Sequence, residues 1–216
     1  MRVGDQNMSG VTDFIALDVE TANSDYSSIC SVGLVHFKSQ AIHKSIAFLV
    51  DPEAEFSPAN IAVHGITPES VAGKPPMDQV LRAIGATLAN CAIAHHSPFD
   101  RLALARAAEK YGAPAPQVHW IDTLQVARHT WTDFKDNGGY GLANLASAFG
   151  IELVHHDAAE DARVAGLILL RAIADSGSSL QSIVDEFADS EEEEEVRESS
   201  KIARFGRRIA RKSRSR

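Results

Sequence analysis

The 216-residue sequence has little of what would place it in several protein classes. Its two cysteines, Cys30 and Cys91, lie in apolar segments without metal-ligand spacing, which predicts reduced, buried thiols and excludes a disulfide framework. No apolar run approaches the roughly 20 residues that a bilayer span requires. Residues 1–10 lack the apolar segment of a signal peptide. We therefore expect a cytoplasmic protein without a membrane span.

Positive charge is scarce outside the C-terminal segment. Eight of the 21 Lys and Arg residues lie in residues 201–216, which contain no acidic residue. Residues 1–200 therefore hold 13 basic residues against 29 acidic ones, and this part should repel nucleic acid at long range. If the ligand contains phosphate, bound divalent cations or the basic segment must reverse the local charge.

The pattern of apolar residues predicts one domain built on a mixed α/β sheet. Three β-like runs separated by short polar breaks favour an antiparallel meander, at residues 11–19, 28–37 and 42–50. Helices and short buried strands then alternate. We expect strands at residues 91–95 and 118–121, and helices after Ser57-Pro58, at residues 77–89 and 98–111, near Leu124 and Leu142, and at residues 158–174.

The composition changes beyond residue 175. A Ser-Gly-Ser-Ser segment and an acidic run are followed by the basic end. We therefore divide the chain into an N-terminal extension (1–10), the folded domain (11–176), an acidic linker (177–200) and a basic tail (201–216). In the tail, Ile202, Phe205 and Ile209 have helical spacing, so an amphipathic basic helix on a partner surface is one interpretation and solvated disorder the other. Nucleic acid is the first candidate partner, and a partner protein or an anionic membrane the next.

The first chemical signal is Asp18 and Glu20 at the end of an apolar strand. Side chains alternate along a strand, so both project from one face with Cα atoms about 7 Å apart, which suits hard cations. The same spacing at Asp51 and Glu53 follows a strand exit marked by Pro52, where a solvated loop is the better interpretation. Two carboxylates at the end of a buried strand repel one another unless a cation compensates.

The second signal is the segment from His95 to Asp100, which runs from a strand end into a helix. Asp100 has a structural interpretation: Ser97 as N-cap, Pro98 at the first helical position and Asp100 at the third form an approximate capping box. A carboxylate in the first turn of a helix can equally face a metal site. Both interpretations stay open on this segment alone.

The third signal is His156 and Asp161. If both were helical, their spacing of five residues would place them on different faces. Asp157 followed by Glu160 matches a capping pattern, which places His156 in the loop before the helix and Asp161 in its first turn. Both can then face one site, although a lone loop histidine is more often solvated than catalytic.

Taken in order, these three signals resemble the DEDDh exonucleases, which include the proofreading subunit of bacterial DNA polymerase III, RNase T and oligoribonuclease. The resemblance spans roughly residues 11–175 and includes His-Gly-Ile-Thr at residues 64–67 and the helical segment at residues 141–151. One segment differs: the family commonly has His-Asn-Ala where this chain has His95-His96-Ser97.

The resemblance implies an RNase H-like fold, with a mixed five-stranded sheet flanked by helices and a disordered or helical charged tail. It also implies a 3′→5′ exonuclease that releases nucleoside monophosphates with two divalent ions, Mg²⁺ or Mn²⁺. By resemblance, Asp18 would bridge the ions, Glu20 and Asp161 would complete the water-activating ion, and Asp100 would help to hold the second. His156 would be the general base.

The expected substrate is a single-stranded or frayed 3′ end, with DNA favoured over RNA. The backbone around Thr21 would receive the terminal nucleotide, with His64, His95 and Phe99 as further substrate-binding candidates. A packing role in its own helix is the alternative for Phe99. A polymerase is a further candidate partner. An exoribonuclease acting on short RNA and a catalytically silent nucleic-acid-binding scaffold are the alternative functions.

Overall fold

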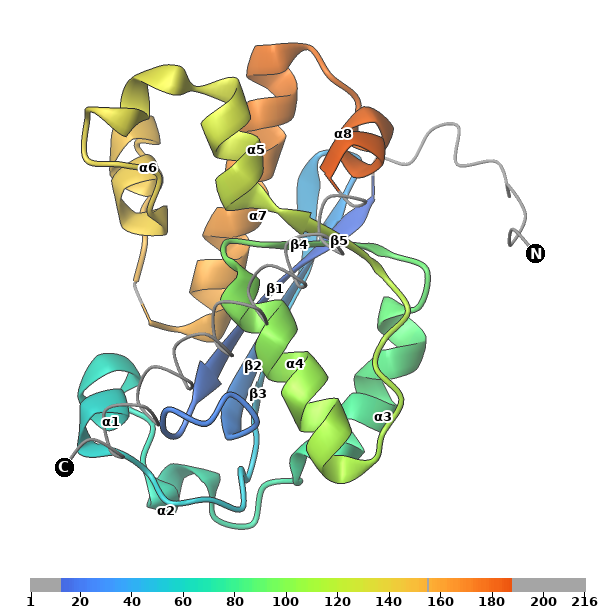
Figure 1. The fold of residues 1–216 in the computed structure, drawn as a ribbon, viewed down its shortest axis with the longest axis vertical. Coiled ribbons are helices and arrows are strands. Elements are labelled where there is room, and N and C mark those ends of the chain that lie inside the picture. Colours follow the sequence, from blue (N-terminus) through green and yellow to red (C-terminus); the bar gives the residue numbers. More distant parts are fainter. Residues whose placement is uncertain (1–12, 155, 188–216) are drawn as a thin grey trace, which may run out of the picture.

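The computed structural model describes residues 13–154 and 156–187. These residues form a five-stranded sheet with helices on both faces (Figure 1). The strands are β1 (Phe14–Thr21), β2 (Ile29–Lys38), β3 (Ala41–Leu49), β4 (Ala92–His95) and β5 (His119–Asp122). The helices are α1 (Pro58–His64), α2 (Pro68–Val71), α3 (Met77–Leu88), α4 (Pro98–Tyr111), α5 (Thr123–Thr130), the 3₁₀ helix η1 (Thr132–Lys135), α6 (Leu142–Phe149), α7 (Ala158–Ser176) and α8 (Leu180–Phe187).

The sheet has the strand order β3-β2-β1-β4-β5. The first three strands are antiparallel, whereas β4 and β5 run parallel to β1, as expected once helices connect the strands. The predicted RNase H-like mixed sheet is therefore confirmed. This order places β1 at the centre, where its C-terminal end adjoins the end of β4.

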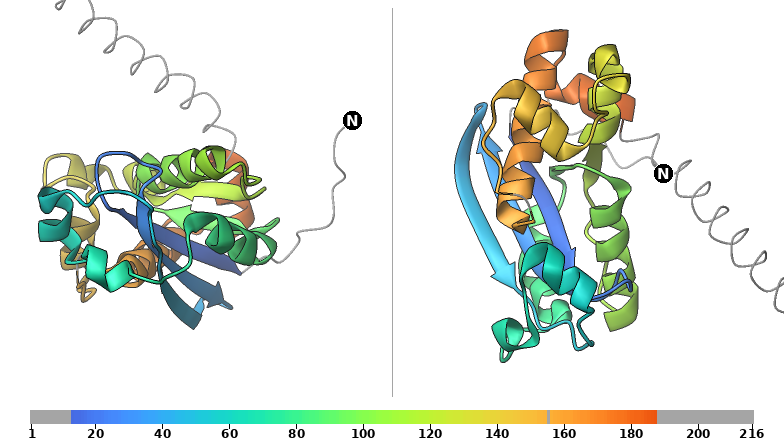
Figure 2. Two further views of the ribbon diagram at one scale, coloured as in Figure 1. Left: turned by 90° about the horizontal axis from the view of Figure 1, so that it is seen from below. Right: turned by 90° about the vertical axis from the view of Figure 1, so that its left-hand side faces the viewer.

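Two apolar layers cover the sheet, and β1 contributes to both. Ile15, Leu17 and Val19 pack with α3 and α4 on one face. Phe14 and Ala16 pack with α7 and α8 on the other. Figure 2 shows the helices on opposite sides of the sheet. Because side chains alternate along a strand, the next residues on the α7 face are Asp18 and Glu20.

Two glycines let α7 lie close to the sheet. A Cβ atom at Gly33, which pairs with Asp18 across β1 and β2, would lie 2.1 Å from the carbonyl oxygen of Ala158 at the start of α7. A Cβ atom at Gly166 would lie 2.1 Å from the ring of Phe37. Only a residue without a side chain permits these approaches.

The expected elements are present, with small differences in their bounds. The first strand continues to Thr21, two residues beyond the predicted end, and residues 11 and 12 lie outside the described part. The short helices α2 and η1 were not predicted. Cys30 and Cys91 are free thiols, and Cys30 is buried as predicted, whereas Cys91 is only partly buried because it lies at the turn just before β4. Among the described residues, no helix is long and apolar enough to span a bilayer.

Helix α8 corrects the expected boundary between folded domain and linker. We placed residues 177–200 outside the fold, yet Leu180, Ile183 and Val184 are buried against the α7 side of the sheet. The Ser-Gly-Ser-Ser break is therefore a connection within the fold, beginning at Gly177 in the left-handed conformation that ends α7. The proposed extension at 1–10, the acidic run and the basic tail lie outside the described residues.

Candidate active site

The site begins where the α7 face of β1 changes from apolar to acidic. Asp18 and Glu20 follow Phe14 and Ala16 on the same face, at the C-terminal end of the central strand. Both acids line a pocket of about 210 Å³. The strand thus places two carboxylates at a fixed separation on a rigid element.

Asp161 joins them from the first turn of α7. Asp157 caps this helix by accepting hydrogen bonds from the backbone N–H groups of Ala159 (3.0 Å) and Glu160 (3.1 Å). The capping position that the sequence predicted for Asp157 is therefore present. The close approach at Gly33 brings this turn onto β2 beside Asp18. Asp161 is only 4% exposed and lines the same pocket.

Asp100 reaches the site from the start of α4. Ser97 caps this helix, accepting from the Phe99 N–H at 3.3 Å, and Pro98 lies in its first turn. Asp100 is 2% exposed, and its Oδ1 accepts a hydrogen bond from the backbone N–H of Val19 at 3.1 Å. The predicted capping box is thus only half present, because the Asp100 carboxylate turns to β1. This hydrogen bond connects the start of α4 to β1 at Val19, which lies between Asp18 and Glu20.

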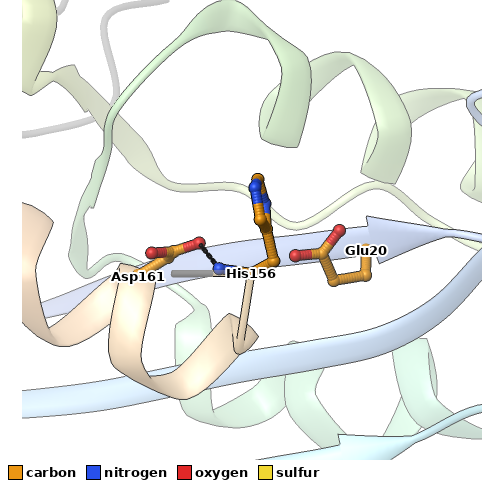
Figure 3. A group of neighbouring side chains, drawn as sticks. All are labelled: Glu20, His156 and Asp161. Carbon is orange, nitrogen blue, oxygen red and sulfur yellow. Dashed lines mark hydrogen bonds between the residues drawn. The ribbon is translucent and has the colours of Figure 1, made fainter. Parts of the chain in front are cut away.

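His156 lies in the loop before α7, as the capping pattern predicted. Its backbone is left-handed, with φ of 68°, and its N–H donates to Asp161 Oδ2 at 2.9 Å. The side chain is exposed. Donor atoms of Glu20, His156 and Asp161 lie within 4.8 Å of one another, and Figure 3 shows the backbone of His156 between the two carboxylates. A histidine and two acids from opposite ends of the domain sequence thus meet at one point.

Burial and mutual repulsion raise the pKa values of three carboxyl groups. Burial, followed by repulsion from Asp161 and Asp100, raises the pKa of Glu20 from its usual 4.5 to about 8. Burial and the same two neighbours raise the pKa of Asp18 well above its usual value. Burial also raises the pKa of Asp100 to about 6. The cluster therefore holds protons near neutral pH unless positive charge replaces them.

The donor set fits hard divalent cations. Asp18, Glu20, Asp100 and Asp161 all line the pocket and offer carboxylate oxygens, which Mg²⁺ and Mn²⁺ prefer. The raised pKa values of Asp18, Glu20 and Asp100 indicate a concentration of negative charge that a cation would neutralise. No Lys or Arg is among the described residues that line the pocket. A phosphate ligand would thus depend on bound cations here.

The rest of the pocket wall is apolar or uncharged. Phe99 and Leu142, the first residue of α6, contribute the apolar part, and His96 and Ser97 contribute polar groups. Of the four predicted substrate-binding residues, Phe99 is in this wall. The other three occupy different positions.

Thr21 and His64 support the end of β1. The His64 ring accepts from the Ile66 N–H through Nδ1 (3.0 Å), so its Nε2 holds the proton and donates to the Thr21 carbonyl oxygen at 3.1 Å. Asn60 donates to the same oxygen at 2.9 Å. The Thr21 side chain is 4% exposed. These bonds anchor α1 beside the tip of β1 (Figure 1). The contacts that we predicted between substrate and both His64 and the backbone around Thr21 stay predictions.

His95, which we also predicted as a substrate contact, has a buried side chain. Its side chain is 1% exposed, Nδ1 bonds to the carbonyl oxygen of Ser97, and the ring packs edge-on against Trp120 at 5.4 Å between centroids. A ring buried this deeply supports the turn into α4 through its bond to Ser97. The sequence placed it among the substrate contacts because the burial of a strand-end histidine is not visible in its motif.

Sequence reasoning missed the role of His96 in the pocket wall. Nδ1 of His96 lies 2.8 Å from Thr123 Oγ1, and Nε2 lies 2.9 Å from the carbonyl oxygen of Tyr140. Burial lowers its pKa to about 4, so the ring is neutral at physiological pH. It therefore joins the end of β4 to α5 and to the loop before α6. Its substitution for the family's usual Asn was the available signal.

The comparison with known families decides the class of this site. A model of the RNase T exonuclease family matches residues 15–169. The chain belongs to this exonuclease family. The matched range includes all four acids and His156, and exonucleases of this family use divalent metal ions. The predictions of a DEDDh exonuclease and of an enzyme are confirmed.

Similar proteins include PolC-type DNA polymerase III proteins. The chain is 30% identical over 169 residues to the PolC-type DNA polymerase III of Halalkalibacterium halodurans, and 31% identical over 170 residues to that of Streptococcus suis. Each match covers 76% of this chain. The chain spans only 12% and 11% of the length of these relatives, respectively.

Solved structures share the fold. Exonuclease X in complex with 5′ overhanging duplex DNA is 21% identical with a TM-score of 0.64, covering 80% of this chain and 98% of that one. The nuclease domain of 3′hExo, a DEDDh family member bound to rAMP, is 16% identical with a TM-score of 0.62, covering 76% of this chain and 92% of that one. At these identities the likeness is one of fold.

Proposed function

We propose that this exonuclease removes nucleoside monophosphates from the 3′ end of DNA, using two divalent ions and His156 as general base. The observation that supports this most is one pocket lined by four carboxylates and an exposed histidine. A pure binding module gains nothing from acids that face phosphate, whereas metal-dependent hydrolysis requires them.

In this proposal the chain's own residues hold the ions and move the proton. Asp18, Glu20 and Asp161 would hold the ion nearest His156, and Asp18 and Asp100 would help to hold the second. Bound divalent ions would polarise the phosphate and make a bound water more acidic. His156 would accept the proton of the attacking water, because an imidazole can be a free base and a proton acceptor near neutral pH.

The apolar wall suits the terminal nucleotide. Phe99 and Leu142 offer surface to a sugar and base without groups that recognise base edges. Low sequence preference follows, since specificity for a base requires hydrogen bonds to its edges.

DNA is the favoured substrate because the similar curated proteins are DNA polymerases. RNA is the second candidate, because a structure of the same fold was solved with rAMP bound. Association with a polymerase stays a prediction, since the chain corresponds to a small part of those polymerases.

The test offers single-stranded DNA, duplex DNA and RNA of one sequence, each labelled at the 5′ or the 3′ end, with Mg²⁺ or Mn²⁺. We expect labelled mononucleotide from the 3′ label and a shortening ladder from the 5′ label, with DNA degraded fastest. Asp18→Asn should abolish release because it removes a carboxylate without changing side-chain size. Asp133→Asn, on the exposed 3₁₀ helix η1, is the matched control and should retain activity.

Three outcomes would contradict the proposal in different ways. Mononucleotide released first from the 5′ label would reverse the direction. Faster degradation of RNA would move the substrate to the second candidate. Absence of metal-dependent release from all three substrates would favour the silent scaffold.

A further inference from the structure

An exposed tyrosine lies next to the apolar wall of the pocket. Tyr26, in the loop between β1 and β2, is 39% exposed. In the described part of the chain, four large hydrophobic residues are exposed, and Tyr26 is the aromatic one among them. Its ring meets Phe99 edge to face, with 5.1 Å between centroids and 76° between planes. Phe99 lines the pocket and Tyr26 does not, so the Tyr26 ring lies one ring beyond the pocket wall.

The loop that presents Tyr26 is held by its own hydrogen bonds. Asp25 Oδ1 accepts from the Ser27 N–H (2.9 Å) and hydroxyl (2.8 Å), and the Asp25 carbonyl accepts from the Ser28 N–H (2.9 Å). The Ser28 carbonyl in turn accepts from the Ala22 N–H at 2.8 Å. The loop that carries Tyr26 is thus held before any ligand arrives, so binding to it loses little backbone conformational entropy.

The charge of the described body makes such a contact useful. Residues 13–187 contain 11 Lys and Arg against 21 Asp and Glu, and none of the basic residues lines the pocket. Contacts to phosphate are therefore few beyond bound cations. Stacking on an aromatic ring is a means of holding a nucleic acid strand that does not depend on positive charge.

We propose that Tyr26, supported by Phe99, stacks the nucleobase on the 5′ side of the terminal nucleotide, forming a second subsite for single-stranded DNA. This inference rests on the proposed function, since the pocket must hold the 3′ terminal nucleotide. In this proposal, a strand that leaves the pocket over Phe99 would reach the Tyr26 ring next, because the two rings are in contact. Every base has an apolar face, so the subsite accepts any sequence.

The alternative is that Tyr26 only packs against Phe99 to close the loop. The two roles differ in what happens when the stacked base is missing. A stacking residue loses its effect on a substrate without that base, whereas a packing residue affects every substrate equally.

The experiment compares wild type, Tyr26→Phe and Tyr26→Ala on two oligodeoxynucleotides, one with a base and one with an abasic analogue at the second position from the 3′ end. On the intact oligomer, Tyr26→Ala should raise KM about 5- to 10-fold with kcat little changed, the lower range for one stacked base. Tyr26→Phe should behave as wild type. On the abasic oligomer all three should have the same KM, equal to that of Tyr26→Ala on the intact one.

A KM that rises equally on both oligomers, or does not rise at all in Tyr26→Ala, would overturn the subsite. If Tyr26→Ala fails to fold, the wild-type comparison of the two oligomers decides, because equal KM values there are incompatible with stacking. Failure of the proposed function would give a different result, because wild type would then release no nucleotide from the intact oligomer. The subsite proposal would fail as well in that case.

Discussion

At the scale of single residues, His156 combines an exposed ring with a backbone conformation that L-residues seldom adopt. Its φ of 68° lies in the left-handed region, which asparagine tolerates better than alanine does. Its N–H also holds Asp161. A substitution intended to test the ring should therefore keep the backbone in place.

We predict that His156→Asn lowers kcat about 100- to 10,000-fold, the usual contribution of a general base, and leaves the melting temperature unchanged. Single-turnover cleavage at saturating metal measures the first quantity and thermal unfolding the second. His156→Ala should lose the same activity and also some stability. A His156→Asn variant that keeps most of its activity would remove His156 from the reaction.

Glu20 makes the stability of the metal-free protein depend on pH. Its folded pKa of about 8 lies above the usual 4.5, so the protonated form favours folding. This stabilisation is complete below about pH 4.5 and is lost as the pH rises to about 8. Asp100 adds the same effect between its usual 3.8 and about 6. Metal-free protein should therefore become less stable across this window.

The measurement is melting temperature against pH in EDTA for wild type and Glu20→Gln. We expect the wild-type melting temperature to fall relative to the variant as the pH rises from about 4.5 to 8. Mg²⁺ or Mn²⁺ should restore it, because a cation compensates the charge that the proton otherwise cancels. If the two proteins gave parallel curves of melting temperature against pH, burial and repulsion would not raise the pKa of Glu20.

At the scale of elements, the contact between α7 and β2 determines the distance between Asp161 and Asp18. Gly33→Ala would place a methyl group against the backbone of Ala158, so the start of α7 must shift. We expect about 1–3 kcal/mol of lost stability, as for other overpacked sites, and reduced metal-dependent activity.

Gly85→Ala in α3 is the matched control. A Cβ atom there meets nothing within 4 Å, so alanine should stabilise the helix by about 0.5–1 kcal/mol and leave activity unchanged. Urea unfolding and nucleotide release measure both effects. Wild-type stability and activity in Gly33→Ala would mean that α7 can move without consequence.

The elements that hold the site could be predicted because their signals are local. Alternation along β1 put Asp18 and Glu20 on one face, and the Asp157 cap put His156 and Asp161 on one side of α7. These inferences need only neighbouring residues. The convergence of the elements came from resemblance to a family.

Contacts between distant segments could not be predicted. The Tyr26 ring meets Phe99 across 73 residues, and His96 bonds to Tyr140 across 44. Neither pair has a periodic pattern that links its members. The burial of His95 was missed for the same reason, since it depends on Trp120 in another strand.

At the scale of the whole molecule, charge is divided between an acidic body and a basic end. Deleting residues 201–216 removes eight positive charges. We predict weaker binding of long single-stranded DNA at low salt and a smaller dependence of binding on salt, because fewer counterions are released. Cleavage of oligomers too short to reach beyond the pocket should be unchanged. If the deletion left the salt dependence of DNA binding unchanged, the basic segment would not bind nucleic acid.

Helix α8 sets a practical limit on shortened versions of this protein. Its Leu180, Ile183 and Val184 cover apolar residues of the sheet, among them Phe14 and Ile121. A fragment cut after residue 176, where the sequence suggests a linker, would present that uncovered surface to water and to other molecules. Crystallisation or screening of a trimmed chain should therefore retain everything up to Phe187, or aggregation will be mistaken for a lack of activity.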